Sequence, residues 1–481
     1  MKKLSTSALI LPLVATGCGS VEMQNVEDNR PNIILFVADD HGLDALGCYG
    51  NPIIKTPNLD ALADDGVRFS NAFCTSASSA ASRSVLLTGQ YGHAIGAYGH
   101  THDYHHFSTY ESVKSLPVLL EESGYTTARI GKYHVAPESV YHFQTTYKAD
   151  PRNTVEMAEA SKGIFDSETP FFLYFCTDDP HRSADRKDWR LPNRFGNKDE
   201  GYEGVETIKY DPKDVLVPSF LPDTKESREE IAQYYESISR IDQGFGLMMR
   251  NLEASGKRDN TIVIYISDNG MAFPGAKTTL YDAGMNLPCI ISDPRTDSNK
   301  GGTCDAMLTW ADMTPTLLDM AGVEYEEEDF HGRTFSSAIS KPTGSGRNEV
   351  FAAHNFHEIT MYYPMRVLRD RHYKLIWNVA WQQEYPFASD LWVSSTWQRS
   401  YRDNAELYGE RKMSDFLQRP RFELYDIEND PNESHNLAAE KPELLESMKV
   451  RLLDYMKRTS DPWVICWGDH DTSLQGSGVN L

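Results

Sequence analysis

The chain has 481 residues, of which 70 are acidic and 47 are basic, so its formal net charge at pH 7 is −23. This acidity argues against a nucleic-acid partner, because a nucleic-acid-binding surface needs clustered positive charge. Hydrophobic residues make up 40% of the chain, which allows a large globular core, and any anionic substrate must be held by a local basic pocket.

The N-terminal residues have the pattern of an export signal. Two lysines precede a short apolar segment from Leu4 to Val14, and small residues lead to Cys18 in an Ala-Thr-Gly-Cys ending that resembles a bacterial lipoprotein cleavage box. The segment is too short to cross a bilayer, so we expect a lipoprotein-type signal peptide over residues 1–18 and a tether over 19–30. The expected location is periplasmic or cell-surface, with membrane contact only through the lipid tether. An ordinary signal peptide, which also implies export, is the alternative.

Strand and helix patterns alternate after the tether. Continuous apolar runs that end in polar residues, typical of buried parallel strands, occur in NIILFVADDHG, PFFLYFCTD and NTIVIYISDNG. Helix-like segments lie around them at residues 57–65, 115–123, 227–252 and 314–321. This alternation predicts an α/β fold over residues 31–360, with a mostly parallel sheet sandwiched by helices.

The composition changes at the loop SKPTGSGRN, residues 340–348. The following MRVLRDRHYKLIWNV has the alternation of an antiparallel hairpin, FELYD is typical of a strand that ends in a turn, and residues 441–457 have helical periodicity. We therefore expect a smaller α+β domain, built on an antiparallel sheet, over residues 361–481.

Polar residues follow two of the predicted parallel strands. Asp39 and Asp40 end the first apolar run, and Asp268 and Asn269 end the run at residues 260–270. Ligands of parallel sheets bind beyond the carboxyl ends of the strands, so these four oxygen donors are expected at one edge. One such pair alone is more often a helix cap or a surface turn. Two pairs together predict a site for a hard cation such as calcium or magnesium, since zinc would favour nitrogen or sulfur ligands.

Basic side chains follow other predicted strands. Lys132 and His134 lie after TTARIG, His181 lies after PFFLYFCTD, and Lys277 lies beyond the SDNG turn. Each alone is more often a solvated lysine or a structural histidine. Gathered at one sheet edge with a cation and a helix N-terminus, they predict a pocket for a tetrahedral oxyanion.

The segment SSAASRSVLLTG, residues 78–89, has the local pattern of a helix start with Ser78 or Ser79 as N-cap. The stretch from Ser79 to Arg83 also resembles the C/S-x-P/A-S-R signature of the type I sulfatases of the alkaline phosphatase superfamily. In that family the first residue is oxidised to formylglycine (3-oxoalanine), whose hydrated aldehyde is the nucleophile. The resemblance implies that Ser79 is this residue. It also implies a Ser-type radical sulfatase maturase as partner, because animal members carry Cys there.

Longer blocks resemble the N-sulfoglucosamine sulfohydrolases, or sulfamidases, within this family. They include GHAIGAYGHTHDYHHF, SLPVLLEESGYTTARIGKYHVAPESVYHF, YDPKDVLVPSFLPDT, SDNGMAFPGAKTTLY and HEITMYYPMR, and the likeness extends from about Asn32 to Trp467. Two departures are Ala81, which replaces the usual Pro, and Lys277, which stands where animal sulfamidases carry Arg. Exchange of Arg for Lys turns a bidentate fork into a point charge.

The resemblance also implies a role for each site residue. One calcium ion per chain is bound by Asp39, Asp40, Asp268, Asn269 and an oxygen of the matured Ser79. The expected catalytic roles are nucleophile hydrate for Ser79, its orientation for Arg83 and Lys132, charge balance for Lys277, leaving-group acid for His181 and sulfate release for His134. Substrate contacts are implied for His93, His357 and Glu358.

The function expected from these features is an exo-acting sulfatase. Its substrate would be a sulfated glucosamine saccharide, and it would hydrolyse the N-sulfate of non-reducing-end N-sulfoglucosamine in heparin or heparan sulfate. The alternatives are a glucosamine O-sulfatase, or a phosphate or phosphonate ester hydrolase of the alkaline phosphatase superfamily. A different class is a surface lipoprotein that only binds glycans and leaves Ser79 unmodified. No oligomeric state is predicted.

Overall fold

The structure is a computed structural model that describes residues 28–184, 188–296, 299–343 and 346–468. The predicted signal peptide and most of the predicted tether lie outside the described residues. Within these ranges, no helix combines the length and the apolar character needed to cross a bilayer.

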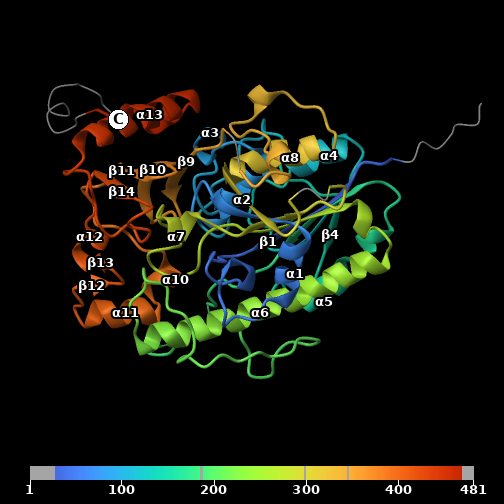
Figure 1. The fold of residues 1–481 in the computed structure, drawn as a ribbon, viewed down its shortest axis with the longest axis horizontal. Helices are drawn as coiled ribbons and strands as arrows, with labels where there is room; N and C mark the ends of the chain where they lie inside the picture. The colour runs from blue at the N-terminus through green and yellow to red at the C-terminus, as the bar shows by residue number, and fades with distance from the viewer. Residues whose placement is uncertain (1–27, 185–187, 297–298, 344–345, 469–481) are drawn as a thin grey trace, which may run out of the picture.

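An eight-stranded sheet forms the centre of the molecule (Figure 1). The strands lie in the order β4-β3-β5-β1-β6-β7-β2-β8. In this sheet β7 runs antiparallel to β6 and β2, and the other neighbouring pairs are parallel. The strands are β1 (Asn32–Ala38), β2 (Val67–Phe73), β3 (Thr126–Gly131), β4 (Thr145–Tyr147), β5 (Phe171–Cys176), β6 (Thr261–Ser267), β7 (Cys289–Ser292) and β8 (Gly302–Thr309).

Helices cover both faces of this sheet, as predicted. Figure 1 shows α2, α4 and α8 on one side and α1, α5 and α6 on the other. The first three helices are α2 (Ser79–Thr88), α4 (Leu116–Glu122) and α8 (Met313–Met320), and the others are α1 (Pro57–Asp65), α5 (Thr154–Ser161) and α6 (Lys225–Ala254). The bounds of α1, α4, α6 and α8 agree with the predicted helical segments to within two residues.

The apolar run of the first strand explains this arrangement. Successive side chains of a strand point to opposite faces. Leu35 therefore packs in one core cluster with Leu86 of α2, while Phe36 packs in a second cluster with Phe245 of α6. Every residue of β1 is buried. A strand covered on both faces needs a continuous apolar sequence, which is why its pattern predicted a parallel strand.

The C-terminal part is built on an antiparallel sheet of order β14-β11-β10-β9. Its strands are β9 (Glu349–Phe356), β10 (Tyr362–Asp370), β11 (Tyr373–Asn378) and β14 (Phe422–Asp426), and a separate pair is formed by β12 (Leu407–Tyr408) and β13 (Arg411–Lys412). Helix α13 (Pro442–Arg458) packs on it through Met448 and Leu452. Because β9 belongs to this sheet, the sheet begins before the boundary drawn at residue 361.

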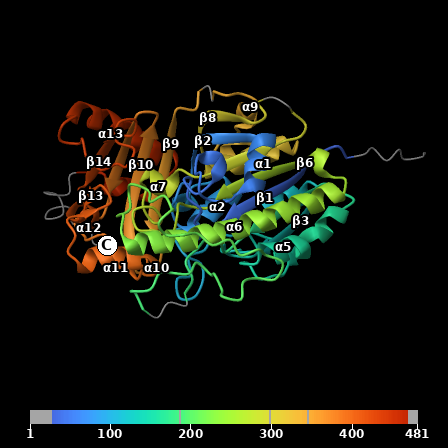
Figure 2. The same ribbon diagram turned by 60° about the horizontal axis from the view of Figure 1, so that its bottom comes forward.

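Short helices complete the chain. They are α3 (Gly92–Ile95), α7 (Asp282–Met285), α9 (Ser336–Ile339), α10 (Ser389–Trp392), α11 (Ser395–Arg402) and α12 (Met413–Leu417). In Figure 2 the orange and red C-terminal part lies beyond one end of the large sheet. Asp390 of α10 contacts Lys277 of the segment that follows β6, so the C-terminal part closes over the carboxyl ends of the strands.

Candidate active site

The predicted oxygen donors meet at the carboxyl ends of β1 and β6. These strands pair in parallel, and Ala38 lies opposite Ser267, so the residues that follow both strands are neighbours. Asp39, Asp40 and Asp268 are fully buried, and one oxygen of each lies within 4.8 Å of one oxygen of the other two. The left-handed backbone of Asp40, with φ of +69°, lets its amide donate to Asp268 Oδ1 at 3.1 Å.

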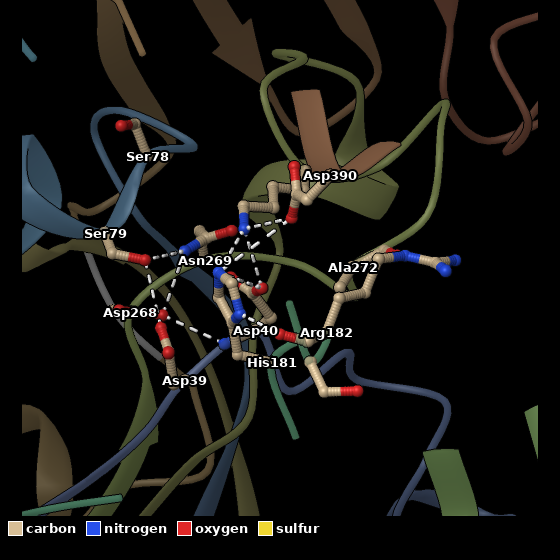
Figure 3. Close-up of polar contacts among 12 residues, drawn as sticks. Asp39, Asp40, Ser78, Ser79, His181, Arg182, Asp268, Asn269, Ala272 and Asp390 are labelled. Carbon is tan, nitrogen blue, oxygen red and sulfur yellow. Dashed lines mark hydrogen bonds and ion pairs between the residues drawn. The ribbon is translucent and has the colours of Figure 1, made fainter. Parts of the chain in front are cut away.

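Ser79 lies beside this acidic group, at the first turn of α2 (Figure 3). Its hydroxyl donates to Asp39 Oδ1 at 3.0 Å and accepts from Asn269 Nδ2 at 3.3 Å. Ser78 is the N-cap, but its hydroxyl contacts His357 Nδ1 at 2.9 Å instead of capping the helix. The N-terminus of α2, without a side-chain cap from Ser78, is an end of the helix that favours an anion.

The donor set fits a hard divalent cation. Asp40 Oδ1 and Asn269 Oδ1 are buried and have no hydrogen-bond partner among the described residues. Burial, together with the neighbouring Asp39 and Asp268, raises the pKa of Asp40 to about 8 although Lys277 opposes the rise. Burial also raises the pKa of Asp268, in spite of Arg83. Crowded, buried oxygens that lack donors are the environment that a calcium-sized ion satisfies.

Two cations border the acidic group on the side of Ser79. Arg83 is fully buried, and its Nε donates to Asp268 Oδ2 at 2.8 Å. Lys132, which follows β3, donates to Asp39 Oδ2. Burial alone would raise the pKa of Asp39, but Lys132, His181 and Arg83 lower it well below its usual range.

A second group of contacts forms around Lys277, which is 1% exposed. Its ammonium donates to Asp40 Oδ2 at 2.9 Å, to His181 Nε2 at 2.9 Å and to Asp390 Oδ2 at 3.0 Å. These three bonds use all three protons of the ammonium. Lys277 therefore joins Asp40, the predicted acid His181 and Asp390 of the C-terminal part.

His181 has a defined orientation. Its Nδ1 lies 2.7 Å from the carbonyl oxygen of Arg182, which can only accept, so Nδ1 carries the proton and the lone pair of Nε2 faces Lys277. Burial, and next Lys277, lower the pKa of His181 to about 3. In the absence of substrate His181 is therefore neutral at neutral pH.

Sequence reasoning missed Asp390. It lies on the short helix α10, outside any pattern of a polar residue after an apolar strand, so no local signal marked it. Burial alone would raise the pKa of this carboxyl, but Lys277 and His181 lower it to about 2. Asp390 is therefore an anion that faces the predicted acid.

The remaining predicted residues divide into two groups. His134 contacts His102 Nδ1 at 2.8 Å beyond β3, and Glu358 accepts a 2.9 Å hydrogen bond from the amide of Ser389, next to Asp390. With His357, they lie at the edge of the contacts around Ser79 and Lys277. His93 does not join them.

His93 lies instead in the packing around the C-terminal end of α13. Its Nε2 contacts Thr459 Oγ1 at 3.1 Å, and its ring stacks on Tyr91. Asp461 lies 3.9 Å from its Nδ1. This location differs from the predicted substrate contact, because the sequence block that contains His93 enters α3, whose side chains serve the packing against the C-terminal part.

Comparison with protein families gives two matches. The family model described as Sulfatase matches residues 31–323, and the model described as N-sulphoglucosamine sulphohydrolase, C-terminal, matches residues 275–392. The N-sulphoglucosamine sulphohydrolase of Homo sapiens is 36% identical over 466 residues, which cover 90% of this chain and 92% of that protein. An N-acetylglucosamine-6-O-sulfatase of Bacteroides thetaiotaomicron is 29% identical and covers 67% of this chain and 73% of that protein.

Solved structures share the fold. A protein in complex with its substrate D-glucosamine-2-N,6-O-disulfate aligns with a TM-score of 0.65 and 21% identity, covering 90% of this chain and 99% of that chain. The phosphonate monoester hydrolase of Agrobacterium radiobacter aligns with a TM-score of 0.63 and 18% identity, covering 89% and 96%. At these identities the likeness establishes the fold, and the alkaline-phosphatase-like architecture predicted from the sequence is confirmed.

Proposed function

Because this chain belongs to the sulfatase family and is a hydrolase, we propose that it removes the N-sulfate from non-reducing-end N-sulfoglucosamine of heparin or heparan sulfate. One observation carries the proposal: identity of 36% to a human N-sulphoglucosamine sulphohydrolase extends over 90% of this chain. The aligned C-terminal family model, residues 275–392, also contains both Lys277 and Asp390. Action on one terminal sugar agrees with the contact that Asp390 of the C-terminal part makes with Lys277, beyond the carboxyl ends of the strands.

The proposed metal is one calcium ion, held by oxygens of Asp39, Asp40, Asp268, Asn269 and the modified residue 79. The unpartnered oxygens of Asp40 and Asn269 support this ligand set. When bound, the ion polarises a sulfate oxygen and favours the ionised nucleophile. The carboxylates in turn fix where the sulfate can lie relative to Ser79.

The proposed modification is oxidation of Ser79 to formylglycine by a Ser-type radical maturase. The hydrated aldehyde supplies an attacking hydroxyl and a second hydroxyl that allows sulfate to be released, which a serine side chain lacks. Arg83 and Lys132 border residue 79 and are proposed to orient it. The N-terminus of α2 adds N–H groups directed at the same anion.

Lys277 and His181 are proposed to act on the sulfate and on the leaving nitrogen. When a sulfate oxygen accepts from Lys277, the Nε2 atom of His181 is released from its hydrogen bond. The bound anion also adds negative charge beside His181, which favours the protonated ring. Nε2 can then give a proton to the departing nitrogen, while Nδ1 stays fixed on the carbonyl of Arg182.

Other residues have supporting roles in this proposal. His134 assists sulfate release, and His357 and Glu358 contact the sugar from the edge of the site. His93 stabilises the packing around α13.

The N-terminal residues are proposed to set the location. Residues 1–18 direct export, and lipid on Cys18 tethers the protein to a periplasmic or cell-surface membrane. Incorporation of radiolabelled fatty acid that persists in Cys18→Ala would contradict that tether.

A glucosamine 6-O-sulfatase is the second candidate. The similarity to the N-acetylglucosamine-6-O-sulfatase of Bacteroides thetaiotaomicron favours it, although that match covers only 67% of this chain. The two candidates differ in the atom that leaves sulfur, nitrogen in one and oxygen in the other.

The test begins with the protein co-expressed with a Ser-type maturase. Peptide mass spectrometry is expected to show the loss of two hydrogens at Ser79. Sulfate release is then measured with N-sulfoglucosamine and glucosamine 6-sulfate, and phosphate release with glucosamine 6-phosphate. Preference for the N-sulfated sugar supports the proposal. Sulfate release from glucosamine 6-sulfate alone would establish the second candidate, and oxidised protein that binds but cleaves none of these sugars would favour a binding role.

A further inference from the structure

Asp390 is an acceptor that the metal site and the nucleophile do not use. Its Oδ2 accepts from Lys277 at 3.0 Å, and its Oδ1 is buried with no partner among the described residues. Figure 3 shows the side chain on the opposite side of the site from Asp39, reaching in from the C-terminal part. Asp390 is therefore a carboxylate with free acceptor capacity, held in place by a buried lysine.

The distance from Asp390 to His181 fits a shared contact with the leaving atom. Asp390 Oδ2 lies 3.9 Å from His181 Nε2. The ammonium of Lys277 already bridges the two groups, at 2.9 Å from Nε2 and 3.0 Å from Oδ2. When Lys277 turns to the sulfate, a leaving atom at ordinary hydrogen-bond length, about 2.9 Å, from both groups fits the same separation. A leaving atom that takes its proton from His181 is therefore within reach of Asp390.

The chemistry of the bridging atom then decides what Asp390 recognises. In a sulfamate, R–NH–SO₃⁻, the bridging nitrogen carries a hydrogen, whereas the bridging oxygen of a sulfate ester carries only lone pairs. A carboxylate can accept from the first and cannot bond to the second. Facing an ester oxygen, it would leave two buried acceptors opposed, which is unfavourable.

We propose that Asp390 is a specificity-determining residue that accepts the N–H of the sulfamate and thereby selects N-sulfate over O-sulfate. Cleavage breaks the S–N bond, sulfur bonds to the oxygen nucleophile, and the bonding pair stays on nitrogen, which takes one proton from His181. The amine that forms keeps its hydrogen bond to Asp390. This inference rests on the proposed function, because it requires a sulfamate substrate.

The matched pair of substrates is N-sulfoglucosamine and glucose 2-sulfate, which carries oxygen in place of the bridging N–H. The readout is the ratio of kcat/KM for the first to that for the second, and the inhibition constant of glucose 2-sulfate replaces its kcat/KM where it is not cleaved. In D390A, we expect kcat/KM for N-sulfoglucosamine to fall about 10- to 100-fold, the effect of removing a charged hydrogen-bond acceptor. The value for glucose 2-sulfate should change much less.

Two variants keep this test interpretable. D390N keeps the shape and one acceptor oxygen without the charge, so its substrate ratio should fall less than that of D390A. D403N changes an exposed carboxylate of the same segment, paired with Arg399 at 2.9 Å, and should leave the ratio unchanged. Thermal unfolding of each variant shows whether the fold is retained.

The outcomes separate this inference from the proposed function. A fall confined to N-sulfoglucosamine supports the role of Asp390. An equal fall for both substrates in D390A shows that Asp390 only positions Lys277 and overturns the inference, while the proposed function stands. Matured wild-type protein that cleaves no N-sulfate overturns both.

Discussion

Two buried charge clusters meet at consecutive residues, and their difference shows what distinguishes a binding site from a structural ion pair. His181 faces the candidate active site, whereas Arg182 faces Glu230 of α6, to which it donates two parallel hydrogen bonds at 2.8 and 3.0 Å. Glu230 also accepts from the amides of Asn193, Ser395 and Thr396. In this Arg182–Glu230 cluster both carboxylate oxygens are satisfied within the protein.

The candidate active site has the same kinds of groups but leaves some of them without partners. Burial alone would raise the pKa of Glu230, but Arg182 and the other hydrogen-bond donors lower it to about 2. At Asp40, burial and the neighbouring acids raise the pKa to about 8. A buried carboxylate that lacks donors implies a ligand, while one that has them all stabilises the fold. The predictions that follow break one cluster at a time.

The largest effect is expected from Ser79→Ala. Loss of the nucleophile should lower kcat/KM for N-sulfoglucosamine by at least about 10⁴-fold, equivalent to about 5.5 kcal/mol. The melting temperature should change little, because the hydroxyl belongs to the candidate active site, where some groups lack partners, and not to the Arg182–Glu230 cluster. Ser84→Ala on the same helix, whose hydroxyl donates to the carbonyl of Ala80 at 2.9 Å, is the control and should retain activity. Ordinary sulfate release by Ser79→Ala would contradict the mechanism.

Loss of the Arg182–Glu230 cluster should lower the stability of the fold. Glu230→Ala leaves Arg182 buried without its partner, so the free energy of unfolding is expected to fall by about 3–5 kcal/mol. Urea denaturation followed by circular dichroism measures this change. The exposed ion pair between Lys114 and Glu122 provides a comparison, since Glu122→Ala should cost no more than about 1 kcal/mol. Equal effects of the two substitutions would show that the cluster does not stabilise the fold.

Acid should weaken the Arg182–Glu230 cluster. The pKa of Glu230 is about 2 in the folded protein and 4.5 ordinarily, which corresponds to about 3 kcal/mol of stability. Because the folded pKa is the lower one, this contribution is complete above pH 4.5 and is lost as the pH falls towards 2. The unfolding free energies of wild type and Glu230→Gln should therefore converge in that range. A constant difference between them would be inconsistent with the depressed pKa.

Calcium bound at the candidate active site should stabilise the folded protein by a smaller amount. At a concentration 100-fold above its dissociation constant, a ligand specific to the folded state adds about 2.7 kcal/mol to the free energy of unfolding. The melting temperature of the wild type should therefore rise with added calcium and fall again with chelator. Asp40→Asn should lose this response, and Asp454→Asn, an exposed change on α13, should keep it. A wild-type melting temperature that does not change with added calcium would argue against the metal site.

The sequence predicted those parts of the fold and site that local patterns determine. β1, β5 and β6 are buried on both faces, so their apolar runs were diagnostic, and the polar residues after β1 and β6 had to share an edge. The start of α2 was also predictable, because Ser78 precedes an apolar face. The roles implied for these residues stay predictions.

The remainder depends on contacts between segments far apart in the chain. Asp390 and Glu230 have no local signature, since their partners lie 113 and 48 residues away. Strand β9 joins the second sheet by pairing with β10, and although the composition changes just before it, at residues 340–348, the predicted boundary at residue 361 left it in the first domain. His93 shares a block with residues near the site, yet the short helix α3 directs it to Thr459. Sequence patterns therefore predicted the edge of the sheet but not what covers it.

The burial of Ser79 has a consequence for how working enzyme accumulates. At 1% exposure, within the first turn of a helix, this hydroxyl is out of reach of any second protein once the chain has folded. The proposed oxidation must therefore take place before the chain folds. A molecule that folds before it is oxidised stays inactive for its lifetime, so the active fraction of a preparation is decided in the cell and cannot be raised afterwards by incubation with maturase.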